Sequence, residues 1–150
     1  KKCKMPALGK YYVSVTGLLT KGWLCVPKFL YRSNNAYNDA LKAEGNVYSS
    51  MFTSKNGVQH TITVWENKEA MQKFMRGDAH SKAMRSLKEV SRYVKVHGYW
   101  TNQIPSADEA IMEWKKNGRR VYGEPTAQCG DEMPVPCWEC TEFEHVNREH

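Results

Sequence analysis

The segment VYSSMFTSKNGVQHTITVW (residues 47–65) decides the fold class of this chain. Residues 47–53 and 58–65 each alternate between apolar and polar side chains, and Asn56-Gly57 between them is typical of a tight hairpin turn. The segment therefore predicts two antiparallel strands. Because side chains alternate across a strand, one face of the second strand carries Val58, His60, Ile62 and Val64. His60 is thus the polar member of an apolar row.

The segments on either side of the hairpin predict further elements. Residues 11–19 are rich in β-branched and aromatic side chains and predict a strand. Pro27 suits the first turn of a helix whose apolar positions recur up to Gly45. Residues 92–101 alternate again and predict another strand.

Two more helical regions are expected after the hairpin. Residues 69–75 predict a helix, which Gly77-Asp78 interrupts. Asp78 is expected to cap a second helical segment through about Val90, because its carboxylate accepts bonds from backbone N–H groups at a helix start. Ser106 and Glu109 have the spacing of a capping box and predict a short helix through Trp114, which Asn117-Gly118 stops.

The predicted order is strand, helix, strand, strand, helix, strand. This is the ferredoxin-like arrangement of the α+β class, a four-stranded antiparallel β-α-β-β-α-β sheet with both helices on one face. The other sheet face must also be buried, so we expect a homodimer. We expect an N-terminal extension at residues 1–10, the folded domain at residues 11–122 and an extended tail at residues 123–150.

Charge is distributed unevenly along the chain. The whole sequence carries a formal charge of +6, and residues 123–150 contain seven acids and one base, which leaves residues 1–122 at +12. An acidic tail on a basic body predicts that the tail folds back on the body or that the two contact different partners. Nucleic-acid binding is not favoured, because the lysines are scattered and form no basic helix.

Composition also sets expectations about the compartment. No apolar run approaches the roughly 20 residues that a membrane-spanning helix needs, so a soluble protein is expected. The sequence opens at Lys1, which is consistent with removal of an upstream targeting peptide. Five cysteines, an odd number, favour a reducing compartment such as the cytoplasm.

Three cysteines and a histidine gather in the tail, at Cys129, Cys137, Cys140 and His145. A tetrahedral zinc site takes four such ligands, and C-x-x-C forms a tight chelating turn. The spacing lacks the two clean pairs of most zinc modules, so a docking tail with ordinary cysteines is favoured over zinc and over a disulfide or redox pair, and all three stay open.

Three motifs carry a resemblance to a known family: CVPKFL (residues 25–30), TITVWENKEAM (residues 61–71) and FMRGDAHSKAM (residues 74–84). Over residues 11–122 the chain resembles the spheroidene monooxygenase-like family, within the dimeric α/β-barrel or antibiotic-biosynthesis monooxygenase-like superfamily. The resemblance implies a pocket between helices and sheet that holds an apolar or planar ligand such as a carotenoid, a quinone or haem. It also implies that His80 is a haem ligand or catalytic base.

The position of His80 agrees with this role. It precedes Ala83 and Met84 by three and four residues, which places it on the apolar side of its helix. A neutral imidazole binds iron or moves a proton near neutral pH. The alternative is an edge histidine that packs against Met84 and touches solvent.

Further residues are expected to shape the pocket, with core packing as the alternative for each. These are the aromatics Trp65, Phe74, Trp100 and Tyr99, together with the strand histidines His60 and His97. Two functional hypotheses follow. One is a monooxygenase-like protein, haem-dependent or cofactor-free. The other is a non-catalytic peripheral subunit that docks by its termini and basic surface onto a larger assembly, such as a photosynthetic membrane complex in the plastid stroma.

Overall fold

The computed structural model describes residues 9–54, 57–123 and 143–145. Six strands form one antiparallel sheet in the order β5-β4-β1-β3-β2-β6. The strands are β1 (Tyr11–Thr20), β2 (Asn46–Ser54), β3 (Gln59–Trp65), β4 (Ser91–Thr101), β5 (Arg119–Gly123) and β6 (Phe143–His145). The α+β, ferredoxin-like prediction is confirmed, and β5 and β6 extend the four predicted strands at the two edges of the sheet.

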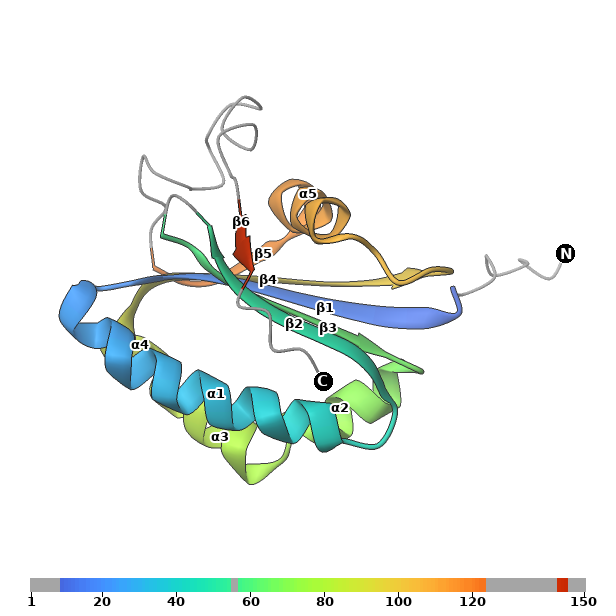
Figure 1. Ribbon diagram of the computed structural model, residues 1–150, viewed down its shortest axis with the longest axis horizontal. Helices are drawn as coiled ribbons and strands as arrows, with labels where there is room; N and C mark the ends of the chain where they lie inside the picture. The colour runs from blue at the N-terminus through green and yellow to red at the C-terminus, as the bar shows by residue number, and fades with distance from the viewer. Residues whose placement is uncertain (1–8, 55–56, 124–142, 146–150) are drawn as a thin grey trace, which may run out of the picture.

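Helices cover both faces of this sheet. The helices are η1 (Trp23–Cys25), α1 (Val26–Lys42), α2 (Lys68–Met75), α3 (Asp78–Arg85), α4 (Leu87–Val90) and α5 (Ala107–Asn117). Helices α1 to α4 lie on one face, and α5 lies alone on the other (Figure 1). No helix within the described ranges is both long enough and apolar enough to cross a bilayer.

The predicted hairpin is present as β2 and β3. Gly57 has φ +82°, a left-handed conformation that glycine adopts without strain, and its N–H donates to the Ser54 carbonyl at 2.9 Å. The register pairs Phe52 with His60 and Ser50 with Ile62. His60 therefore lies in the apolar row that the alternation predicted.

The interrupted helix differs from the prediction at the start of its second segment and at a break within that segment. Gly77, in extended conformation, is the N-cap of α3, and Asp78 is the first helical residue without a capping hydrogen bond. The prediction that Asp78 caps this helix was wrong. Its carboxylate instead lies in the first turn, where negative charge interacts favourably with the helix dipole.

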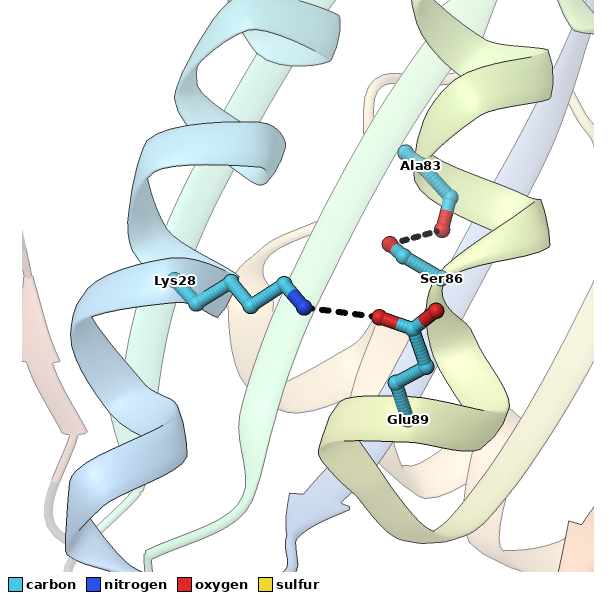
Figure 2. A network of polar contacts seen from close by, with 4 residues as sticks. All are labelled: Lys28, Ala83, Ser86 and Glu89. Atoms are coloured by element: carbon cyan, nitrogen blue, oxygen red, sulfur yellow. Dashed lines mark hydrogen bonds and ion pairs between the residues drawn. The ribbon is translucent and has the colours of Figure 1, made fainter.

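The segment reaches Val90 as predicted, but Ser86 divides it into α3 and α4. The Ser86 hydroxyl donates to the Ala83 carbonyl at 2.9 Å, a local bond that competes with helix continuation. Beyond this break, Glu89 pairs with Lys28 of α1 at 2.7 Å (Figure 2). The hydrogen bond and charge of Lys28 lower the pKa of Glu89. The break thus turns α4 toward the start of α1.

Helix α5 buries the sheet face that was expected to need a second copy of the chain. Its Ala110, Ile111 and Trp114 pack on Val13, Val15 and Ile62 in the largest core cluster. Gly17 of β1 makes room for this contact, because a Cβ there would lie 2.2 Å from the Trp114 ring. Much of the apolar surface that was expected to be buried in a dimer is therefore buried by α5 of the same chain. The homodimer itself stays a prediction.

The capping box that begins α5 is confirmed. The Glu109 N–H donates to the Ser106 hydroxyl at 3.2 Å, and the Ser106 N–H donates to the Glu109 carboxylate at 3.1 Å. The helix runs to Asn117 rather than ending at Trp114 as the sequence indicated. The Trp114 indole N–H donates to the Lys95 carbonyl at 2.8 Å, which fastens the helix to β4.

Candidate functional site

A cavity of about 540 Å³ lies between the α1 to α4 layer and the sheet. Its volume falls in the range of roughly 300–1,000 Å³ that ligand pockets occupy. Strands β1, β3 and β4 form its floor, and the helices form its walls. The cavity is therefore large enough for a multi-ring organic molecule.

The walls are mostly apolar. Helix α2 contributes Met71, Phe74 and Met75, and the next two helices contribute Met84 and Leu87. Unbranched methionine side chains adjust their shape to an irregular partner, and Phe74 offers a flat ring face. This lining suits a flat ligand with an apolar body.

The floor is polar, in contrast to the walls. Five side chains with hydroxyl groups line the cavity from β1 and β3: Tyr12, Ser14, Thr16, Thr61 and Thr63. Ser14 pairs with Thr63 and Thr16 pairs with Thr61 across the two strands, so these four hydroxyls form a compact patch. The Thr63 hydroxyl accepts the indole N–H of Trp65 at 2.9 Å. The Ser14, Thr16 and Thr61 hydroxyls make no hydrogen bond to any other described residue, so they are available to a ligand.

The Tyr12 hydroxyl lies against a glycine of β4. A Cβ at Gly98 would lie 2.1 Å from the Tyr12 hydroxyl oxygen, so only glycine leaves this space. Burial raises the pKa of Tyr12, which keeps its phenol protonated. Tyr12 is therefore a hydrogen-bond donor beside the hydroxyl patch.

His80 lies in the wall of the cavity, in the first turn of α3. Its Nδ1 is 3.2 Å from the Met75 carbonyl oxygen, and its ring meets the edge of Phe74 with 5.3 Å between ring centroids. A carbonyl only accepts hydrogen bonds, so this contact requires the proton on Nδ1. The lone pair of the neutral ring is then on Nε2, for which the described residues supply no hydrogen bond.

Partial burial keeps the His80 ring neutral. Desolvation lowers its pKa below the ordinary value of 6.5, and the bond to the Met75 carbonyl opposes this shift. Near neutral pH the imidazole therefore carries an unprotonated Nε2. That nitrogen has the chemistry of a proton acceptor or a metal ligand.

Two of the other predicted site residues lie behind the cavity. Trp65 is fully buried, and its ring packs on Phe74 with 5.3 Å between centroids. Trp100 meets the edge of Tyr12 at 5.2 Å. Among the predicted residues, Phe74, His80 and His97 line the cavity. Trp65 and Trp100 support residues that line it.

The remaining predicted side chains project from the opposite sheet face. His60 is 2% exposed and lies between Phe52 and Trp114, with ring centroids 5.4 and 4.9 Å away. Burial, followed by the charge of Lys115, lowers the pKa of His60 to about 3. His60 is therefore a neutral member of the core under α5, separated from His80 by the sheet.

Tyr99 and His97 also project toward α5. Their rings stack at 5.3 Å, and His97 Nε2 lies 3.4 Å from a Glu113 carboxylate oxygen. Burial, together with the charges of Glu113 and Glu109, raises the pKa of Tyr99 to about 12. The hydroxyl of Tyr99 is buried without a hydrogen-bond partner among the described residues. Both side chains take part in the α5 contact, and His97 also lines the cavity, whereas Tyr99 does not.

The tail zinc prediction falls largely outside the described residues. Cys129, Cys137 and Cys140 lie there, and His145 is described only as part of β6, paired with Phe52. Within the described part of the chain, no group of three metal-binding side chains comes together. The tail site therefore stays a prediction.

Sequence reasoning missed the polar floor and Arg119, which lines one end of the cavity. The floor carried a signal, since Tyr12, Ser14 and Thr16 alternate with valines in β1. That pattern could have indicated one polar strand face. Arg119 had no such signal, because the strand that carries it was not predicted.

With the geometry established, comparisons with solved structures identify the fold type. A conserved protein from Methanosarcina mazei superposes with a TM-score of 0.56 at 15% identity, covering 61% of this chain and 93% of its own. A candidate antibiotic biosynthesis monooxygenase from Nitrosomonas europaea gives 0.58 at 10% identity, covering 64% and 94%. The cofactor-independent oxygenase SnoaB from Streptomyces nogalater gives 0.55 at 12% identity, covering 64% and 97%.

These similarities establish the fold of the chain as that of antibiotic-biosynthesis monooxygenase-like proteins. No protein-family model and no curated protein sequence matches the chain. At identities of 10–15% the shared feature is the backbone arrangement, and a shared fold does not by itself fix a reaction.

Proposed function

We propose that this chain is a monooxygenase-type protein that binds a flat, largely apolar organic molecule in the cavity and uses Nε2 of His80 as its reactive group. One observation carries the proposal. The Met75 carbonyl holds the proton on Nδ1, which leaves the basic nitrogen of a half-buried, neutral ring at the wall of a ligand-sized cavity.

The chemistry begins with a proton transfer. A flat ketone or phenol with an acidic C–H group loses that proton to Nε2, and the resulting carbanion is electron-rich enough to react with dioxygen. A CH₂ group then becomes a carbonyl, one oxygen atom enters the product, and the other leaves as water. The floor hydroxyls of Tyr12, Ser14 and Thr16 donate hydrogen bonds to the oxygen on which negative charge develops.

Haem is a second ligand class for the same cavity. The hydrogen bond of His80 would suit an iron ligand, because ligating histidines usually donate their second ring N–H to a carbonyl or carboxylate. His80 would hold the iron through Nε2, and the methionine-rich walls would pack on the ring. Bound haem would supply the oxygen chemistry, and the role of the chain would be to bind it and limit water access.

Two similarities support this proposal. The resemblance of residues 25–30, 61–71 and 74–84 to the spheroidene monooxygenase-like family favours an apolar ligand, including a carotenoid. The solved structure of SnoaB, named as a cofactor-independent oxygenase, favours oxygen chemistry without a cofactor. The polar floor favours a ligand with oxygen atoms on its rings over a pure hydrocarbon.

The first test measures both uses of His80 on the purified chain. Absorbance is recorded during a titration with haem, and oxygen uptake is recorded with anthrone, a three-ring ketone with an acidic CH₂ group. We expect one of the two signals in the wild type and its loss in His80→Ala.

His60→Phe is the matched control. It also removes an imidazole, but one that is buried between Phe52 and Trp114 and does not line the cavity. The control should keep the wild-type signal. If wild type, His80→Ala and His60→Phe all bind haem or consume oxygen equally, His80 has no special role and the proposal fails.

A non-catalytic peripheral subunit is the second candidate function. The observation that favours it is the exposed apolar surface at η1 and the first turns of α1, where Leu24 is 73% exposed and Tyr31 71% exposed. The partner would be a larger protein assembly, for which a plastid photosynthetic complex is the host that the family resemblance implies. Removal of residues 123–150 tests it, because the shortened chain should no longer co-purify with that partner.

A further inference from the structure

The described residues that line the cavity include a positively charged side chain and no negatively charged one. None of the described residues that line it is Asp or Glu, whereas Arg119 lines it from β5. An arginine side chain is permanently charged and presents a planar set of donors that matches a carboxylate in two parallel bonds. One end of the cavity therefore carries a positive charge.

The strand register places Arg119 on the cavity face of the sheet. Arg119 pairs with Val96 of β4, which pairs with Thr16 of β1, which in turn pairs with Thr61 of β3. Residues directly opposite one another across neighbouring strands project to the same face. Neighbouring strands are about 4.8 Å apart, so the Arg119 backbone is roughly 10 Å from Thr16 along this row. This separation is about the length of a three-ring system.

Arg119 is not engaged by an acid of the described chain. Lys28 pairs with Glu89 and His97 lies against Glu113, but none of the described residues forms an ion pair or a side-chain hydrogen bond with the Arg119 guanidinium. The neighbouring Arg120 pairs with Lys95 in the strand register and projects to the other face. Within the described ranges, Arg119 is thus a cation without an acidic partner at one end of the hydroxyl floor.

We propose that the ligand is an amphipathic anion, whose flat apolar body lies on the hydroxyl floor and whose carboxylate binds Arg119. This inference rests on the proposed function, because it names the chemical class of the molecule in the same cavity. The Met71, Phe74 and Met84 side chains cover the body, and the guanidinium fixes which end of the ligand is turned away from β3.

A matched pair of probes tests the inference. Anthracene-2-carboxylate and anthracene-2-carboxamide have the same shape and differ in charge at neutral pH. Their dissociation constants are measured by titration calorimetry with the wild type, Arg119→Gln and Arg120→Gln. We expect the wild type to bind the carboxylate about tenfold more tightly than the carboxamide, as a charge-assisted bond predicts.

The two variants separate the site from general charge. In Arg119→Gln the affinity for the carboxylate should fall about tenfold to that of the carboxamide, with carboxamide binding unchanged. Arg120→Gln removes the same charge from the other face and should keep the preference. Equal binding of both probes by the wild type, or a preference that survives in Arg119→Gln, overturns the inference and leaves the cavity function intact. Failure of both probes to bind overturns the inference together with the proposed function.

Discussion

The carbonyl oxygen of Met75 lies 3.2 Å from Nδ1 of His80, and this contact joins the end of α2 to the first turn of α3. Gly77 lies between the two helices in extended conformation, so α3 begins as a new helix directly after the end of α2. One backbone group therefore sets both the orientation of the imidazole and the nitrogen that keeps its proton.

The ionisation of His80 gives the first prediction. Burial lowers the pKa of His80 below 6.5, so at pH 6.5 most of the rings should still be neutral. A titration of the His80 ring signals by NMR should have its midpoint below that of a histidine in an unfolded peptide. A midpoint at or above pH 6.5 would contradict the half-buried, Met75-bonded ring.

His60 makes the stability of the domain depend on pH. Its pKa is about 3 in the folded state, against the ordinary value of 6.5 that a histidine of the unfolded chain has, so the unfolded chain binds the extra proton between these values. The free energy of unfolding should thus fall as pH drops below 6.5, by about 2 kcal/mol from pH 6.5 to pH 4.5.

The His60→Phe variant isolates this effect. Phenylalanine keeps an aromatic ring between Phe52 and Trp114 but does not titrate. Urea unfolding of both proteins across this pH range should give a flatter pH dependence for the variant. Parallel curves for the two proteins would show that His60 does not titrate differently in the folded and unfolded states.

The contact between β1 and α5 predicts the effect of a single methyl group. In Gly17→Ala the added Cβ would lie 2.2 Å from the Trp114 ring, so the helix or the ring must move. Overpacking of this kind should lower the free energy of unfolding by about 1–3 kcal/mol, measured by urea unfolding. Gly22→Ala is the control, because nothing lies within 4 Å of a Cβ at that position. Equal stability of the two variants would mean that α5 packs less closely than described.

The capping box of α5 gives a smaller and more local prediction. Ser106→Ala removes the hydroxyl that accepts the Glu109 N–H and should cost about 1 kcal/mol of stability in thermal or urea unfolding. Ser106→Thr keeps a hydroxyl group at the cap and should recover most of the loss. An unchanged melting temperature in Ser106→Ala would count against a role for the cap in stability.

Local sequence signals predicted much of the fold, because they act over a few residues. The turn at Gly57 and the capping box at Ser106 each depend on neighbouring side chains, and both are present. The prediction that Asp78 caps α3 was wrong, and the cause is also local. Gly77 takes the extended conformation first and thereby becomes the cap residue itself.

The site was harder to predict, because its residues meet through the sheet register. His80 and Phe74 were found from a helical stripe and a family resemblance, and both line the cavity. His60 and Tyr99 were assigned to a pocket although alternation gives only the face of a strand and not which helix covers it. The position of α5 on the far face decides that question, and it arises from contacts distant in sequence.

The helix that carries His80 is only eight residues long and has no fully buried side chain. Isolated helices of this length are only marginally stable in water, so α3 depends on its contacts with the neighbouring helices for stability. Its amide protons should therefore exchange with solvent by local opening, while those of β1 and β3 exchange only when the whole domain unfolds. A molecule could thus enter or leave the cavity through brief fraying of two helical turns while the sheet stays closed.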